Sequence, residues 1–271
     1  MDKRLFFIFL FLFLISLIAY LSFESKNEDN FSIYFFDAGK ADSFIISNND
    51  KYIMIDTGEE NLKDEILEYF KIHNISKLDY LIITHFDKDH VGSASAIVDN
   101  ISIDRVLITN TKKDSVYYLN FINSLNDKNI IPLIVSGDFE FNLSQVNVIV
   151  SGPEKIYDKN ESNNSSLIIS IEYGNNSFLF MGDAENARIK DFIELNNKKY
   201  DFIKIPYHGN YLKRLDDLFD STQPKYAVIT SSYDDEKTIS ILEKYNIEFY
   251  NTKNGSIIVE SDGTNILIKQ N

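Results

Sequence analysis

The chain has 271 residues, which is enough for one large domain or two small ones. Hydrophobic residues make up 44% of it, so it can bury a sizeable core, and the absence of cysteine excludes disulfides, a thiolate zinc site and a cysteine nucleophile. The formal net charge of −14 opposes non-specific attraction to nucleic acid or to an anionic membrane surface.

The amino end differs from the rest of the chain. Residues 5–23 carry no charge and are almost wholly apolar, and they follow Lys3 and Arg4. A helix of this length, at about 1.5 Å per residue, just crosses a bilayer core of about 30 Å. Basic residues before such a helix favour a cytoplasmic amino end. We therefore predict a single-pass membrane anchor over residues 1–24, a polar linker over 25–30 and an extracytoplasmic domain over 31–271.

A cleaved signal peptide, which would make the protein secreted, is the alternative interpretation of this segment. The apolar run is longer than the core of a usual signal peptide, and residues 18–20 (Ile-Ala-Tyr) form a poor cleavage site. Both features favour the uncleaved anchor.

Strands and helices alternate through residues 31–271, which predicts an α/β domain without a second domain. The first half contains predicted strands at 31–37, 43–47, 52–55, 81–83, 105–109, 130–135 and 145–150, and helices at 61–73, 93–99 and after Asp114. The second half contains predicted strands at 167–173, 178–181, 202–205, 226–230, 257–260 and 265–269, and helices at 184–195 and 235–245.

A dense group of possible metal ligands follows the apolar strand 81–83. Four of them lie within six residues: His85, Asp87, Asp89 and His90. Open α/β sheets place their ligands at the carboxyl ends of strands. Nitrogen and oxygen donors at this density suit one or two divalent metals. A solvated polar loop is the alternative, which the preceding apolar strand and the following Gly92 disfavour.

Three further polar residues stand at the ends of predicted strands. Asp56 precedes a glycine turn, Asp183 joins a strand to a helix, and His208 follows strand 202–205. Each alone has an ordinary structural explanation as a turn residue, a helix cap or a core histidine. Because all of them lie at strand ends, as the 85–90 loop does, we expect them to share one site.

With these residues in place, the chain resembles the metallo-β-lactamase fold superfamily and, within it, the hydrolase domain of the DNA-uptake protein ComEC. The likeness runs from about residue 31 to near the carboxyl end. Its motifs are residues 36–43 (FDAGKADS), 55–58 (IDTG), 84–92 (THFDKDHVG), 164–167 (NSSL), 179–185 (LFMGDAE), 203–209 (IKIPYHG) and 255–259 (GSIIV).

The resemblance implies an αββα sandwich with two divalent metal ions, Zn²⁺ or Mn²⁺, at one edge of the sheets. It assigns the first metal to His85, Asp87 and Asp183. It assigns the second metal to Asp89, His90, Asp183 and His208, with Asp183 bridging. Asp56 is expected beside the ligands, where it would steady their loop and hydrogen bonds.

The chain departs from the wider superfamily at the first metal. Asp87 stands where the superfamily has a histidine, and no histidine occurs between His90 and Asp183 to provide the usual third ligand. Asn164 and Ser165 are candidates to fill that gap in part. An oxygen-rich first site shifts the preference from zinc toward manganese, magnesium or iron. Tyr207-His208-Gly209-Asn210 also differs from the His-His-Gly-Ser typical of ComEC-like domains.

Two metals can clamp the attacking and leaving oxygens of an in-line displacement at phosphorus and activate a bridging water. We therefore predict a membrane-anchored phosphodiesterase or nuclease acting on DNA or a small phosphodiester. Asp89, with Asp56, is predicted as catalytic. Candidate substrate contacts are Asn164, Ser165, Lys204 and Asn210.

Two other functions stay open. A β-lactam, lactone or thioester hydrolase would share the fold, because a fold does not fix a function, but the carboxylate-rich ligand set disfavours it. A catalytically degenerate binding module is disfavoured by the retention of six ligand-type side chains. The acidic charge weakens the nuclease form, since binding of duplex DNA usually needs a basic stripe.

Overall fold

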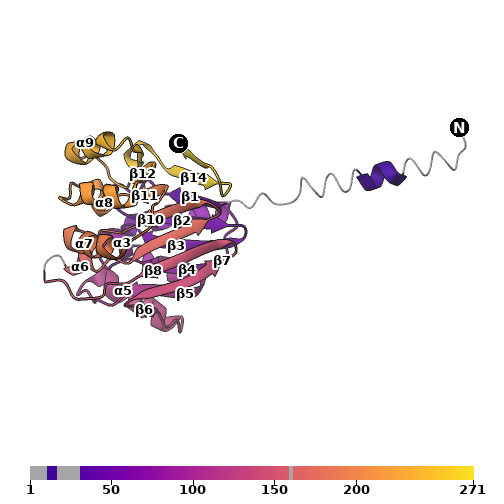
Figure 1. Ribbon diagram of the computed structural model, residues 1–271. Coiled ribbons are helices and arrows are strands. Elements are labelled where there is room, and N and C mark those ends of the chain that lie inside the picture. The colour runs from indigo at the N-terminus through magenta and orange to yellow at the C-terminus, as the bar shows by residue number, and fades with distance from the viewer. Residues whose placement is uncertain (1–10, 17–30, 159–160) are drawn as a thin grey trace, which may run out of the picture.

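The computed structural model describes residues 11–16, 31–158 and 161–271. Residues from 31 onward fold into two mixed sheets packed face to face, with helices on both outer sides (Figure 1). The predicted αββα sandwich is confirmed.

The first sheet has eight strands in the order β15-β14-β1-β2-β3-β4-β5-β6. Strands β3 to β6 pair in parallel, and the others pair antiparallel. Their bounds are β1 (Phe31–Phe35), β2 (Ser43–Asn48), β3 (Lys51–Thr57), β4 (Lys77–Ile83), β5 (Ser102–Thr109), β6 (Leu133–Val135), β14 (Ile257–Ser261) and β15 (Ile266–Gln270).

The second sheet has seven strands in the order β13-β12-β11-β10-β9-β8-β7, and β10 to β13 pair in parallel. Their bounds are β7 (Asp138–Leu143), β8 (Val146–Ser151), β9 (Ile168–Tyr173), β10 (Asn176–Phe180), β11 (Phe202–Lys204), β12 (Tyr226–Ile229) and β13 (Glu248–Asn251). Each sheet therefore has a parallel half, and the carboxyl ends of parallel strands are where polar site residues gather.

Aromatic rings fill the space between the sheets. Phe44 of β2 stacks on Phe180 of β10 across the interface at 5.0 Å between centroids, and Phe35 packs on Phe44 at 4.9 Å. All three side chains are at most 1% exposed. Apolar burial of this kind is the main stabilising contribution to such a sandwich and fixes how the two sheets face each other.

Helices cover the outer faces with their apolar sides. The first sheet is covered by α2 (Lys63–Ile72), α4 (Ala94–Asn100) and α5 (Val116–Asp127), and the second by α7 (Asn186–Leu195), α8 (Leu215–Thr222) and α9 (Glu236–Lys244). Shorter turns are η1 (Glu60–Leu62), α3 (Lys88–Val91), α6 (Glu161–Asn164), η2 (Tyr207–Gly209) and η3 (Thr252–Asn254).

Among the strands and the helices longer than one turn, β7, α8 and β13 were not predicted from the sequence, and the short segments α3, α6 and η1 to η3 were not predicted either. Strand β7 lies at an edge of its sheet, where it pairs with β8, so its side chains are mostly exposed or half-buried. Its residues alternate between polar and apolar, so the signal of a half-buried strand was present, although Asp138 and Glu140 have a low propensity for strands. Helix α8 follows the charged pair Lys213-Arg214 and is short, although it buries Leu215, Leu218 and Phe219.

The predicted membrane anchor over residues 1–24 lies outside the described part of the chain, except for residues 11–16, which are helical. Among the described residues, none belongs to a helix with the length and apolar character that crossing a membrane requires. The anchor and the linker at 25–30 stay predictions.

Candidate metal centre

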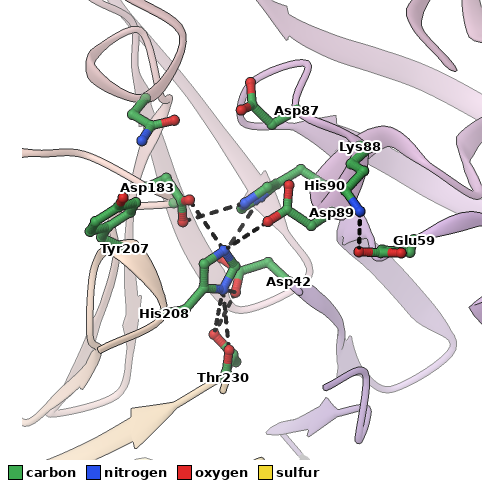
Figure 2. A network of polar contacts seen from close by, with 12 residues as sticks. Asp42, Glu59, Asp87, Lys88, Asp89, His90, Asp183, Tyr207, His208 and Thr230 are labelled. Atoms are coloured by element: carbon green, nitrogen blue, oxygen red, sulfur yellow. Dashed lines mark hydrogen bonds and ion pairs between the residues drawn. The ribbon is translucent and has the colours of Figure 1, made fainter. Parts of the chain in front are cut away.

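The site lies where strands of both sheets end (Figure 2). The first sheet contributes His85, just beyond β4, and His90 on α3. The second contributes Asp183 after β10 and His208 on η2 after β11. Gly182 lets the two sheets meet here, because a Cβ at this position would lie 2.9 Å from the Thr84 hydroxyl, and its φ of +51° disfavours other residues.

Several site residues adopt a left-handed backbone conformation. The φ angles are 53° at Asp56, 55° at Tyr207 and 51° at His208. Non-glycine residues adopt such angles at a cost in free energy, and they do so most often where function fixes a side chain. The left-handed turn at residues 207–208 directs the His208 ring toward Asp183.

Four buried atoms converge without a hydrogen-bond partner among the described residues. They are Nε2 of His85, His90 and His208, and Oδ1 of Asp183. His90 Nε2 lies 3.3 Å from Asp183 Oδ1, and His208 Nε2 lies 3.1 Å from Asp183 Oδ2. Orphaned buried polar atoms are rare in folded proteins, because leaving them unpaired is costly. A divalent metal would bind the lone pairs of these atoms, and imidazole nitrogens and carboxylate oxygens are common metal ligands.

The opposite nitrogen of each imidazole is held in place. His90 Nδ1 donates to Asp56 at 2.8 Å, and His208 Nδ1 donates to the Thr230 carbonyl at 3.2 Å. His85 Nδ1 lies 3.2 Å from the Thr84 hydroxyl. A proton on Nδ1 leaves the lone pair of a neutral ring on Nε2, where a metal can bind it.

Asp56 lies behind the ligands. It is fully buried, and its two oxygens accept hydrogen bonds from the Thr84 backbone and hydroxyl, at 2.8 and 2.7 Å, and from His90. Both oxygens are committed, and solvent does not reach them. These contacts favour a role for Asp56 in positioning His90 over the catalytic role predicted from the sequence.

Asp42 belongs to the site, although the sequence analysis did not select it. Together with His90, Asp183 and His208 it forms a buried cluster whose ligand-type atoms all lie within 4.8 Å of one another. Its carboxylate is ion-paired with Lys204 and lies 3.2 Å from His208 Nδ1, the nitrogen that faces away from Asp183. We therefore assign Asp42 to holding His208, as Asp56 holds His90. The sequence signal that could have identified Asp42 is its position in the FDAGKADS motif, between Ala41 and Ser43.

The buried charges perturb one another. Burial opposes a charged imidazole, but Asp183 and Asp42 outweigh it and raise the pKa of His208 to about 10. Asp183 and Asp56 likewise raise the pKa of His90 well above its usual value. Burial, and then the neighbouring His90, lower the pKa of His85 to about 3. Without a metal, the cluster therefore holds protons on His90 and His208, and a bound cation would take their place.

Three of the four candidate substrate contacts are buried. Lys204 is fully buried against Asp42, so its ammonium group cannot reach a substrate. The Asn164 side chain accepts from the backbone N–H groups of Glu185 and Arg188 at 3.1 Å, and Ser165 is 1% exposed. Asn210 is half-buried, and its side chain donates to the Tyr207 carbonyl at 2.7 Å and accepts from the Tyr233 hydroxyl. Its contact with substrate stays a prediction.

The remaining two candidate ligands, Asp87 and Asp89, differ in surroundings. Asp89 Oδ2 lies 3.4 Å from His208 Nε2, and its side chain is 21% exposed. Asp87 lies 3.7 Å from His85 Nε2, but the same oxygen accepts from Lys113 and from Ser162. In Figure 2, Asp87 stands apart from the group formed by Asp89, His90, Asp183 and His208.

The fold and the buried histidine–aspartate cluster define a metal-dependent hydrolase. The family model of the metallo-beta-lactamase superfamily matches residues 37–231, and the chain belongs to this superfamily.

Two curated relatives are similar to this chain. ComE operon protein 3 of Bacillus subtilis is 25% identical over 201 residues, which cover 71% of this chain and 26% of that protein. Recombination protein 2 of Haemophilus influenzae is 27% identical over 216 residues, which cover 78% of this chain and 25% of that protein. The chain thus spans about a quarter of the length of each, and the predicted likeness to ComEC-like proteins is confirmed.

Solved structures share the fold. The metallo-beta-lactamase fold protein YhfI from Bacillus subtilis matches with a TM-score of 0.59 at 11% identity, over 86% of this chain and 100% of that chain. Tm1679, a metal-dependent hydrolase of the beta-lactamase superfamily, matches with a TM-score of 0.54 at 13% identity, over 82% of this chain and 95% of that chain.

Proposed function

We propose that this hydrolase cleaves phosphodiesters, in DNA or in small molecules. The observation that carries the proposal is the composition of the ligand cluster. Two carboxylates, Asp89 and Asp183, stand around the imidazole Nε2 atoms of His90 and His208, which have no hydrogen-bond partner among the described residues. No thiolate ligand is available, because the chain has no cysteine. Sites with many oxygen ligands favour Mn²⁺, Mg²⁺ or Fe, whereas sites with nitrogen ligands alone favour zinc. Metals of the first group are suited to displacements at phosphorus.

A metal bound here would act as a Lewis acid and lower the pKa of a bound water. The chain contributes Asp89 as the proton acceptor. Burial alone would raise the pKa of this carboxylate, but the contact with His208 and the charge of His90 lower it to about 2, so Asp89 is ionised at neutral pH. It is also more exposed than Asp183, with side-chain exposures of 21% and 5%, so a reacting water can approach it.

The name of the Haemophilus influenzae relative, Recombination protein 2, favours a nucleic-acid substrate. The net charge of −14 argues against extensive contact with duplex DNA. The basic side chains near the site within the described part of the chain have acidic or aromatic partners: Lys88 is paired with Glu59 at 2.9 Å, Lys113 is bonded to Asp87, and Lys40 lies over the ring of Tyr207. These features support a short contact with one phosphodiester group.

The test is a substrate panel with the purified full chain. Bis-nitrophenyl phosphate, short single- and double-stranded DNA and a chromogenic β-lactam are each offered with Mn²⁺ and with Zn²⁺. We expect metal-dependent turnover of the phosphodiesters, and loss of that turnover in Asp89→Asn. Turnover of the lactam alone would replace this proposal by the lactam hydrolase, and full activity of Asp89→Asn would exclude Asp89 as the proton acceptor.

We also propose that the protein is anchored in the cell membrane through residues 5–23, with the hydrolase domain outside the cytoplasm. The uncharged apolar run after Lys3 and Arg4 supports this placement. Protease added to intact cells should remove the domain, while a tag at the amino end stays protected. Recovery of the whole domain in the medium would instead support cleavage and secretion.

A further inference from the structure

Lys113 contacts Asp87, the candidate ligand that stands where the wider superfamily has a histidine. Its ammonium group donates to Asp87 Oδ1, and the Ser162 hydroxyl of α6 donates to the same oxygen. That oxygen has little lone-pair density left for a metal, and a dication on the other oxygen of the same carboxylate would lie beside the Lys113 ammonium group and be repelled by it.

The loop that carries Lys113 is fixed at this place. The Thr109 hydroxyl at the end of β5 donates to the Ser165 carbonyl at 2.6 Å, and the Thr111 and Ser165 hydroxyls lie 3.0 Å apart. Both contacts join the loop to the segment that carries Ser162. The Lys113 side chain is only 36% exposed, so its charge belongs to the site rather than to the open surface.

The other donors for a metal beside His85 are too few. His85 Nε2 has no partner within the described part of the chain, but the sequence provides no further histidine between His90 and Asp183. Asn164 and Ser165, which could have filled the gap, are buried and make other hydrogen bonds. What remains is one imidazole and a share of Asp183, which already faces His90 and His208.

The side of the centre away from His85 has a full set of ligands for one ion, and we call it the complete side. Asp89, His90, Asp183 and His208 offer two imidazoles and two carboxylates, and positioning carboxylates hold both rings. A second dication beside His85 would compete with the Lys113 ammonium for Asp87 and would be repelled by it.

We propose that this centre binds a single divalent ion, at Asp89, His90, Asp183 and His208, and that the Lys113 ammonium group replaces the second cation of a two-metal site. The inference rests on the metal dependence of the proposed function and is independent of its substrate. Lys113 supplies positive charge beside His85 but no Lewis acid, so the activated water belongs to the one bound ion.

The experiment counts metal ions. The full chain, purified in mild detergent and stripped with a chelator, is loaded with excess Mn²⁺ and passed through a desalting column, and manganese is measured per chain. We expect one ion in the wild type, two in Lys113→Met and one in Lys112→Met. The last variant is the matched control, because Lys112 is the exposed neighbour on the same loop.

Electron paramagnetic resonance gives an independent result on the same samples. The wild type should show the spectrum of an isolated Mn²⁺ ion, and Lys113→Met should show a spin-coupled pair. Two ions in the wild type would overturn the proposal without any variant. One ion in a folded Lys113→Met, checked by circular dichroism, would show that Lys113 is not what excludes the second metal.

The result separates this inference from the proposed function. A wild type that binds one ion but hydrolyses no phosphodiester would overturn the function and leave the metal count intact. A wild type that binds two ions and hydrolyses phosphodiesters would do the reverse.

Discussion

The two sides of the centre contain the same residue types but differ in what stands behind them. On one side, Asp56 and Asp42 hold the rings of His90 and His208, so that both Nε2 atoms face Asp183. On the other side, the polar atoms nearest to His85 Nδ1 among the described residues are the hydroxyl groups of Thr84 and Ser166, and a lysine is bonded to the neighbouring carboxylate of Asp87. Under the single-ion proposal, the groups bonded to the ligands, and not the ligand residue types alone, decide which side of the centre binds a metal.

Removal of His208 should have the largest effect. His208→Ala deletes an imidazole of the complete side, so we expect loss of bound metal and a decrease in kcat/KM of about 1000-fold or more. Elemental analysis and the phosphodiester assay measure both. His73→Ala is the matched control, because His73 is exposed and stacks on Tyr69 outside the site. Metal retained in His208→Ala would contradict the assignment.

Asp56→Asn should have an intermediate effect, because it weakens the support of one ligand while the ligand itself remains. We expect Mn²⁺ affinity to fall by about 10- to 100-fold, the usual cost of losing such a partner. Excess metal should restore much of kcat. A large decrease in kcat at saturating metal would instead show that Asp56 takes part in catalysis. Calorimetric titration of the metal-free chain measures the affinity.

His85→Ala should have a smaller effect, if one ion occupies the opposite side. We expect the metal count to stay at one and kcat/KM to fall by about tenfold or less, since His85 would contact the bound ion or substrate only at the periphery. Elemental analysis beside His208→Ala makes the comparison direct. Complete loss of metal in His85→Ala would mean that both sides hold the ion together.

The smallest expected effect is a pH dependence of stability without metal. The pKa of His208 is about 10 in the folded state, above its value of about 6.5 in an unfolded chain. Its contribution to folding is therefore fully present below about pH 6.5 and is lost as the pH rises toward about 10. The Tm of the chelator-treated chain should fall by a few degrees over this window. The metal-loaded chain, with its imidazoles deprotonated, should lack this decrease, and a rise in Tm would contradict the assignment.

The sequence predicts the fold and the clustering of the ligands well, because both follow from local patterns. Strand-end positions of Asp183 and His208 imply a common edge, and the motifs around them imply the superfamily. The pairing of Asp42 with Lys204 joins residues 162 positions apart and leaves no local signal, so Lys204 was wrongly assigned to substrate. The bond between Lys113 and Asp87 was missed for the same reason, since a lysine before a helix usually faces solvent.

The ligands of the complete side come from both sheets: Asp89 and His90 follow β4, whereas Asp183 and His208 follow β10 and β11. An ion held there would cross-link two halves of the sandwich in a chain that has no cysteine for a covalent bridge. Metal supply would then govern resistance to unfolding and proteolysis as well as turnover, because any ion that binds only the native state stabilises it in proportion to the logarithm of its concentration. Scarcity of the ion would thereby shorten the lifetime of the protein itself.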